Sequence, residues 1–255
     1  MSETYMQASA EVAKIAGEVA LKYYRRNPEQ RLKSDGSPVS VADLEAERAA
    51  REWIEKRFPD DGILGEELPT VREAAKRRWV LDPIDGTLTF LRGVPFWGTL
   101  VAVTEGDEVL AGAASFPAIG ESLAAAPGAG CWHNGARCSV STVSDVRRAM
   151  VLTTDARFLR DANRRGRWLD LQNNARAMRT WGDCYGYLLV ATGRADVMVD
   201  DIVSVWDAAA LMPIITEAGG VFTDWKGKAT PFGGDAIATN AALAGEVRNI
   251  LGARA

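Results

Sequence analysis

The stretch from Arg78 to Thr87 constrains this chain more than any other, because it sets two acids around a proline at the end of an apolar run. Residues 79–81 are short and apolar, which predicts a buried strand. Pro83 fixes its own φ and has no N–H, so we expect the strand to stop there and turn. Asp82 and Asp85 flank that turn, and it should aim both carboxylates at one point.

The paired acids predict a metal site. Two carboxylates held close together repel each other unless a positive charge lies between them. An all-oxygen site suits Mg²⁺, which binds a few carboxylates and keeps waters that a phosphate can replace. Behind the acids, Gly86 permits a tight backbone and Thr87 can begin a helix as its N-cap. The alternative is an ordinary acidic turn, since Asp-Pro and Asp-Gly are common turn sequences.

Composition bounds the class of protein. The 255 residues are 47% hydrophobic, enough for a sizeable core in one domain or two tightly joined halves. A net charge of −4 gives no reason to expect nucleic acid or a membrane surface as a partner. The charged residues among the first 20 argue against a signal peptide, and no apolar run approaches the roughly 20 residues that span a bilayer.

Cysteine and histidine usage points away from disulfide, zinc and histidine chemistry. The three cysteines make an odd count without a disulfide framework, and a reducing cytoplasm is the simplest location. Cys131, His133 and Cys138 lack a nearby fourth ligand and fit no common zinc spacing. His133 is the only histidine, and no nucleophile motif accompanies it.

The first 130 residues predict two helices packed on a largely antiparallel sheet. An apolar stripe at helical spacing indicates a helix over residues 4–24. Ser40 with Asp43 three residues later resembles a capping box for a second helix, which should run to about residue 58. Between these helices, residues 33–39 form a polar turn-forming loop. Further strands are expected at residues 96–104, 109–116 and 121–126.

Residues 131–255 alternate between strand and helix patterns, which favours α/β layering. Strands are expected at residues 150–153, 177–180, 196–199, 221–223 and 236–238. Helices are expected near residues 168–174, at 184–192 and at 207–218, with a final helix capped by Asn240. No linker is evident near residues 128–148. We therefore expect an N-terminal half, 1–130, and a C-terminal half, 131–255, joined as one compact unit.

Acids at the ends of short apolar elements recur along the chain, at Asp43, Glu66, Asp82, Asp85 and Asp207. Strand ends and helix starts can hold charged side chains rigidly toward a shared cleft. Taken singly, each acid also has an ordinary explanation. Asp207 complements the dipole of the helix that it begins, and Glu66 is a solvated acid.

Together these segments resemble the inositol monophosphatase family, which comprises Mg²⁺-dependent phosphatases of small phosphomonoesters. The resemblance lies in Gly65–Glu67, Trp79–Thr87 and Val205–Ala210, followed by Glu217–Gly220. The motifs occur in family order and at compatible spacing, from the first helix to the last. The resemblance implies a layered αβαβα sandwich, usually a homodimer, that acts on a small phosphorylated metabolite.

The resemblance also implies two or three Mg²⁺ ions in each active site. Glu66, Asp82 and the Ile84 carbonyl would hold one ion. Asp82, Asp85 and Asp207 would hold a second, with Asp82 bridging the two. Paired metals about 3.5–4 Å apart stabilise both the attacking and the leaving oxygen of an in-line displacement.

Further roles carry over from the same family. The backbone amides of Gly86 and Thr87 would receive phosphate oxygens. Thr87 and Asp43 would orient and deprotonate the attacking water, with Glu66 as a further catalytic residue. Lys33 matches a loop lysine that precedes this aspartate, and its role stays open.

The aspartyl-phosphate (haloacid dehalogenase) family is a rival, since it also places acids and Gly-Thr after an apolar strand. Its acids lie two positions apart, and the first is the nucleophile. Asp82 and Asp85 lie three positions apart, which misaligns that pairing. We therefore reject this family.

Two stretches, residues 88–102 and 179–187, resemble the histidinol-phosphatase branch of the family. Histidinol phosphate carries an ammonium and a titratable imidazole, and Asp183 or Asp200 could pair with either. Inositol offers only hydroxyls and gives no reason for another carboxylate. We count Arg179 among the substrate contacts with these two acids. The alternative is that Asp183 caps the following helix.

Two other functions remain open from the sequence. One is another phosphatase of the same family, acting on inositol phosphate or a nucleotide 3′-phosphate. The other is a catalytically silent metal-binding regulator that keeps the fold. The acids and Thr87 are all present, which favours catalysis.

Overall fold

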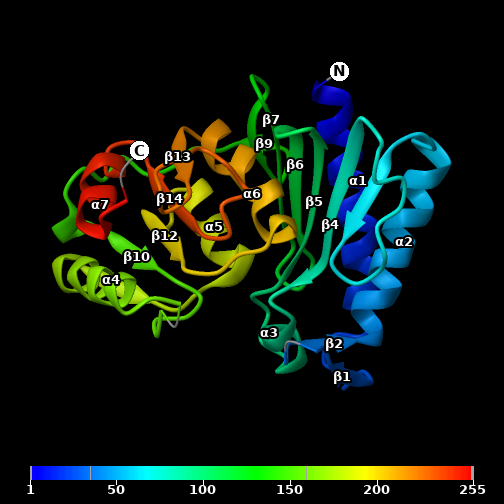
Figure 1. Cartoon of the computed structure of the whole chain (residues 1–255), viewed down its shortest axis with the longest axis horizontal. Helices are drawn as coiled ribbons and strands as arrows, with labels where there is room; N and C mark the ends of the chain where they lie inside the picture. Colours follow the sequence, from blue (N-terminus) through cyan, green and yellow to red (C-terminus); the bar gives the residue numbers. More distant parts are fainter. Residues whose placement is uncertain (1, 35, 159, 254–255) are drawn as a thin grey trace.

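The computed structural model describes residues 2–34, 36–158 and 160–253, and these form five layers (Figure 1). Helices α1 (Ser2–Leu21) and α2 (Val41–Arg57) cover one face of the first sheet. Helices α5 (Asp183–Ala191) and α6 (Val205–Glu217) lie between that sheet and a second one. Helices α4 (Ala162–Asn174) and α7 (Ala244–Leu251) cover the outer face. The predicted αβαβα sandwich is confirmed.

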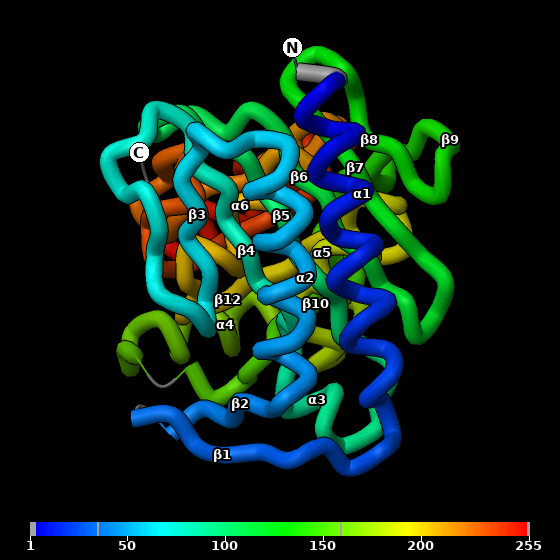
Figure 2. Tube along the Cα trace, turned by 90° about the vertical axis from the view of Figure 1, so that its right-hand side faces the viewer, coloured from blue at the N-terminus to red at the C-terminus, as the bar shows by residue number. Residues whose placement is uncertain are grey.

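The two N-terminal helices lie side by side on the first sheet, with a small ribbon at their lower end (Figure 2). Helix α1 ends at Leu21, earlier than predicted, because positive φ angles at Arg25 and Asn27 turn the chain away from helical geometry. Helix α2 begins with the predicted capping box of Ser40 and Asp43. The ribbon pairs β1 (Gln30–Leu32) with β2 (Pro38–Ser40), and Asp35 of the predicted loop lies outside the described residues.

The first sheet has seven strands in chain order, with β3 and β4 parallel and every later pair antiparallel. Both faces of its centre are covered by helices, so β5 is buried along nearly its whole length. The strands are β3 (Gly62–Gly65), β4 (Arg77–Asp85), β5 (Gly98–Glu105), β6 (Glu108–Phe116), β7 (Glu121–Ala126), β8 (Gly130–His133) and β9 (Ala136–Arg137).

We had expected strand β4 to stop at Pro83. Instead it continues through a bulge to Asp85. Asp82 pairs with Leu100 and Asp85 pairs with Gly98, so β4 has one residue more than β5 in this interval. Residues three apart on a regular strand point to opposite faces, and one extra residue brings them to the same face. Pro83 is tolerated because the ladder is interrupted where its N–H is missing. The bulge therefore turns both aspartates to one side.

The second sheet has five strands in the order β11, β10, β12, β14, β13. Its first three strands are parallel, and β14 is antiparallel to both of its neighbours. The strands are β10 (Met150–Leu152), β11 (Ala177–Arg179), β12 (Val197–Asp200), β13 (Gly220–Thr223) and β14 (Ala236–Asn240). Two short helices, α3 (Thr87–Leu91) and η1 (Val146–Arg148), complete the described elements.

Three helix starts in the second half differ from the prediction because the caps lie elsewhere. Helix α4 begins after Asp161, whose side chain accepts a hydrogen bond from the Asn163 N–H. Helix α6 begins at Val205 because Ser204 provides its cap. Asn240 ends β14 instead of capping the last helix, although its side-chain oxygen accepts from the Leu243 N–H before α7 begins.

The change from the first sheet to the second follows β9 at Arg137. The boundary expected between residues 130 and 131 falls inside β8, so a division of the chain would come a few residues later. The independence of the two halves stays a prediction. Among residues 2–34, 36–158 and 160–253, no helix has the length and apolar character needed to cross a membrane.

Close packing of α6 on β6 can be tested at Gly112. A Cβ atom at this position would lie 2.3 Å from the Ala210 carbonyl oxygen and 2.8 Å from a Pro213 ring carbon. Gly112→Ala should destabilise the protein by about 2 kcal/mol and lower its melting temperature by about 4–8 °C. Gly245→Ala is the control, because no atom lies within 4 Å of its added methyl group. Equal melting temperatures for the two variants would contradict the packing described.

Candidate active site

Three aspartates from two distant segments converge beside the β4 bulge. One carboxylate oxygen each from Asp82, Asp85 and Asp207 lies within 4.8 Å of the other two. The first two come from the bulge, and Asp207 comes from the first turn of α6. Among the residues that the structure describes, these aspartates are the one set of three acidic, cysteine or histidine side chains close enough to share a metal ion. The sequence prediction named all three.

A backbone N–H orients each of these carboxylates. Asp82 accepts from the Ile84 N–H at 3.1 Å, across the bulge. Asp85 accepts from the Cys184 N–H at the start of α5. Asp207 accepts from the Ser204 N–H at 2.7 Å, as part of the capping box of α6. Asp207 therefore belongs to the cluster and also lies in the first turn of α6, where its charge complements the helix dipole.

Burial and mutual repulsion make the charged form of this cluster costly. Burial, followed by the charges of Glu66 and Asp85, raises the pKa of Asp82 well above its usual range. Burial, followed by Asp183 and Asp207, does the same to the pKa of Asp85. Burial raises the pKa of Asp207 to about 7. A bound cation would relieve this repulsion, and an all-oxygen donor set favours Mg²⁺ or a similar hard ion.

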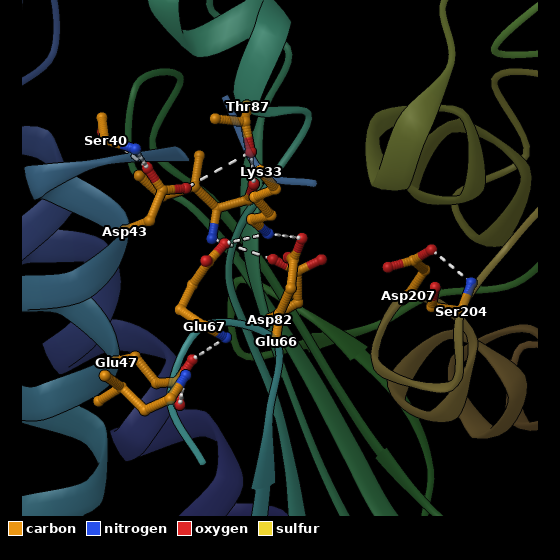
Figure 3. Close-up of polar contacts among 12 residues, drawn as sticks. Lys33, Ser40, Asp43, Glu47, Glu66, Glu67, Asp82, Thr87, Ser204 and Asp207 are labelled. Atoms are coloured by element: carbon orange, nitrogen blue, oxygen red, sulfur yellow. Dashed lines mark hydrogen bonds and ion pairs between the residues drawn. The ribbon is translucent and has the colours of Figure 1, made fainter. Parts of the chain in front are cut away.

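Glu66 lies beside Asp82 at the cluster edge and is held by Lys33 (Figure 3). The Lys33 ammonium lies 2.6 Å from Glu66 Oε1 and 2.7 Å from Glu67 Oε1. Burial lowers the pKa of Lys33, but the hydrogen bonds to the two glutamates outweigh it and raise the pKa overall. Burial raises the pKa of Glu67 to about 7. Lys33, whose role the sequence left open, thus bridges two adjacent carboxylates.

Thr87 and Asp43 lie near Glu66 and Lys33 (Figure 3). The Thr87 hydroxyl is 2.9 Å from the Ile84 carbonyl oxygen and 3.4 Å from Asp43 Oδ1. Asp43 is fully buried, and its second oxygen accepts from the Ser40 N–H and hydroxyl. The N-cap of α3 is Gly86, at φ 84°, and not Thr87 as we had expected. The left-handed backbone at this position favours glycine.

Two adjoining cavities open onto these residues. The metal-site cavity, of about 390 Å³, is lined by Lys33, Ser37, Glu66, Asp82, Ile84, Asp85, Gly86, Thr87, Ser204, Trp206 and Asp207. The neighbouring cavity, of about 400 Å³, is lined by Ser37, Pro38, Glu66, Gly86, Thr87, Leu88, Thr89, Val94, Phe96, Thr154, Thr180, Gly182 and Asp183. Because both share Gly86 and Thr87, one small molecule can reach from the acidic cluster into the second cavity.

Asp183 lies in the second cavity and does not cap α5. The N-cap is Gly182, which makes no side-chain cap bond, and Asp183 is the first helical residue, at φ 50°. Its N–H donates to the Thr154 hydroxyl at 2.8 Å, and its carboxylate accepts from the Thr89 hydroxyl at 3.3 Å. Burial and the charge of Asp200 raise the pKa of Asp183 to about 6. The capping alternative is wrong.

The other two predicted substrate contacts differ from Asp183. Asp200 is buried, and its oxygens accept from the Thr154 N–H and the Tyr187 hydroxyl, both at 2.9 Å. It lines a narrow cavity of about 60 Å³ beside Asp183 and Asp207. Arg179 is exposed at the end of β11 and donates to the carbonyl of its neighbour Met178. Neither of the two larger cavities includes Arg179 in its lining.

Two contacts in the site were not anticipated from the sequence. The backbone N–H of Cys184 donates a hydrogen bond to Asp85, and no sequence pattern predicts such a backbone donor. Glu47, four residues after Asp43 in α2, is fully buried and accepts from the Glu67 N–H at 2.8 Å. The signal for Glu47 was available, because it lies with Asp43 on the apolar face of the helix.

Comparison with known proteins extends over nearly the whole chain. The model of the inositol monophosphatase family matches residues 1–252. The chain belongs to the inositol monophosphatase family. It is 40% identical to a histidinol-phosphatase from Chlorobaculum parvum over 91% of this chain and 90% of that protein. It is 38% identical to a histidinol-phosphatase from Mycobacterium tuberculosis, over 87% of each chain.

A solved structure of an inositol monophosphatase from Zymomonas mobilis superposes with a TM-score of 0.87. It is 30% identical to this chain and covers 98% of both chains. The predicted family is thereby confirmed, together with its fold. Three of the ligands that this resemblance implied, Asp82, Asp85 and Asp207, lie close together, and Glu66 lies beside Asp82. The role of each residue stays a prediction.

The repulsion within the cluster predicts opposite effects of Asp82→Asn with and without metal. In EDTA the variant should melt about 2–4 °C above the wild type, roughly 1 kcal/mol, because one of the opposed buried charges is gone. With 10 mM MgCl₂ the wild type should gain stability by binding the ion, and the variant should gain much less. Asp170→Asn, on the exposed side of α4, should behave like the wild type. Equal Mg²⁺ stabilisation of all three proteins would contradict a metal site at Asp82.

Proposed function

We propose that this protein is a Mg²⁺-dependent phosphatase that hydrolyses L-histidinol phosphate to L-histidinol and phosphate. The observation that carries the proposal is the half-buried carboxylate of Asp183, which lines a cavity adjoining the one that holds the three aspartates. Similarity to histidinol-phosphatases at 38–40% identity supports the same substrate. A small phosphorylated metabolite is therefore the proposed partner.

The donor set fits Mg²⁺. Asp82, Asp85 and Asp207 offer carboxylate oxygens that lie close enough to share an ion, and Glu66 lies beside them. The Ile84 carbonyl belongs to the same cavity lining. Bound Mg²⁺ neutralises phosphate charge and activates water for attack on phosphorus. We propose two or three ions in the site.

The chain's own residues hold the reactants in place. The Thr87 hydroxyl, between the Ile84 carbonyl and Asp43, is proposed to orient the attacking water. Asp43 is proposed to take up the proton, since Ser40 holds its other oxygen and fixes its direction. Gly86 and Thr87 line both cavities, and we propose that their backbone N–H groups receive phosphate oxygens.

The second cavity matches the remainder of histidinol phosphate. Leu88, Val94 and Phe96 give it an apolar wall suited to an imidazole ring, and Asp183 supplies a carboxylate for a cationic nitrogen. Inositol phosphate would place hydroxyls there and gain no ion pair. Asp200 already accepts two protein hydrogen bonds, so we propose that it supports the pocket from behind and that Asp183 makes the contact.

The catalytically silent alternative is disfavoured by the same geometry. A metal-binding regulator needs no hydroxyl placed between a carbonyl ligand and a buried aspartate, as Thr87 is. A cytoplasmic location and a homodimer stay predictions from the sequence.

Substrate preference is the first prediction of this proposal. With Mg²⁺, the specificity constant for L-histidinol phosphate should exceed that for inositol 1-phosphate by at least about 100-fold, as expected for one desolvated ion pair. Phosphate release from both esters and from adenosine 3′-phosphate measures it. A higher specificity constant for inositol phosphate would assign the enzyme to the other branch. The absence of Mg²⁺-stimulated release from every ester would favour the silent regulator.

Asp183→Asn isolates the carboxylate, because asparagine also tolerates a positive φ. The variant should lose about 10–100-fold in kcat/KM for histidinol phosphate and keep its activity on glycerol 2-phosphate within about threefold. Asp155→Asn is the matched control, since this nearby exposed carboxylate already pairs with Arg157. An equal loss on both esters would mean that Asp183 serves the reaction centre and does not select the substrate.

A further inference from the structure

A buried ion pair in α2 grips the turn that carries Glu66 and Glu67. Glu47 accepts from the Glu67 N–H at 2.8 Å and from the Leu68 N–H at 3.2 Å. Arg51, one helical turn further on, donates to Glu47 at 2.7 Å. Its other nitrogens donate to the carbonyls of Leu68 at 2.9 Å and Pro69 at 3.0 Å. Figure 3 shows Glu47 meeting the Glu67 backbone from below.

Burial of this ion pair costs desolvation free energy. Glu47 is fully buried and Arg51 is nearly so. An ion pair taken out of water is often no more stabilising than well-packed apolar residues of the same size. Here the two side chains make four hydrogen bonds with the backbone of residues 67–69. Their effect is to fix one short segment of chain.

The Glu47 carboxylate packs directly against the Gly65 backbone. A Cβ atom there would lie 1.9 Å from the Glu47 carboxylate, so only glycine leaves room for it. On the opposite side, the Glu66 N–H donates to the Leu81 carbonyl of β4 at 3.1 Å. The turn is thus held between β4, which carries Asp82, and α2, which carries Asp43.

We propose that Glu47 and Arg51 are positioning residues for the metal site. Neither touches the aspartate cluster or the cavities. They act through the backbone of the turn, which sets where the Glu66 carboxylate lies relative to Asp82 and where Glu67 meets Lys33. The inference rests on the proposed metal dependence, but not on the identity of the phosphate ester.

Metal binding to the whole protein tests this role directly. Mn²⁺ binds the same oxygen ligands as Mg²⁺, and titration of EDTA-stripped protein by electron paramagnetic resonance gives its affinity without substrate. Glu47→Gln and Arg51→Met should weaken Mn²⁺ binding by about 10-fold or more, the usual effect of losing a group that orients a metal ligand. The Mg²⁺ concentration for half-maximal activity should rise equally, with kcat at saturating Mg²⁺ within about threefold.

The same helix offers a matched control. Arg48 and Glu45 form an ion pair of similar length, 2.5 Å, on the exposed face of α2. Arg48→Met should change neither Mn²⁺ affinity nor half-activation by more than about twofold, as expected for a surface pair. Arg51→Lys keeps the charge beside Glu47, but a lysine cannot donate to two carbonyls as the planar guanidinium does. Its Mn²⁺ affinity should fall by about threefold.

A double-mutant cycle separates positioning from a general loss of stability. Gly65→Ala should weaken Mn²⁺ binding in the wild-type background, because its methyl group displaces the turn from Glu47. The same change should have a smaller effect when Glu47→Ala has removed the obstructing carboxylate. Melting curves in EDTA show which variants are folded. If Glu47→Gln, Glu47→Ala or Arg51→Met does not fold, the Mn²⁺ affinities of Arg51→Lys and Gly65→Ala test the positioning role instead.

Folded Glu47 or Arg51 variants that bind Mn²⁺ as tightly as the wild type would overturn the inference. So would equal effects of Gly65→Ala in the two backgrounds. If the wild type itself bound no Mn²⁺, the proposed function would fail first. A wild type that binds Mn²⁺ but prefers another ester would change the substrate and leave the positioning role standing.

Discussion

Repulsion among buried carboxylates is the constraint on which the rest of the structure depends. Asp82, Asp85 and Asp207 lie within 4.8 Å of one another, with Glu66 beside them. Isolated carboxylates would separate or take up protons in such surroundings, as their raised pKa values indicate. The fold prevents separation with backbone N–H groups from the bulge, α5 and α6. Stability is thereby given up at the place where a divalent cation would restore it.

The layers explain how distant segments meet with such precision. The first sheet supplies two acids through one bulge, and the central helices supply Asp207 and the N–H that orients Asp85. The outer helix α2 supplies Asp43 directly and reaches the Glu66 turn through Glu47 and Arg51. The three aspartates therefore rest on regular elements, and the turn that carries Glu66 is held between β4 and α2, which keeps each carboxylate in one direction.

The sequence predicted the acids better than it predicted the backbone that aims them. The Asp-Pro-Ile-Asp run identified both aspartates, but a strand was expected to stop before Pro83, since a bulge depends on pairing with Gly98 and Leu100 far along the chain. Asp183 was predicted with helix capping as the alternative, because the sequence does not reveal that its N–H donates to Thr154, two residues after β10. Glu47 was missed because buried charges on a helix acquire meaning only from the turn packed against them.

The central claim is that these carboxylates share divalent ions, and anomalous diffraction from crystals soaked in Mn²⁺ tests it most directly. The account predicts strong anomalous peaks with carboxylate oxygens at about 2.1–2.2 Å, close to the spacing typical of Mg²⁺. One peak should lie between Asp82 and Glu66, and another among Asp82, Asp85 and Asp207. Crystals with well-ordered side chains but no anomalous peak at Asp82 would contradict it.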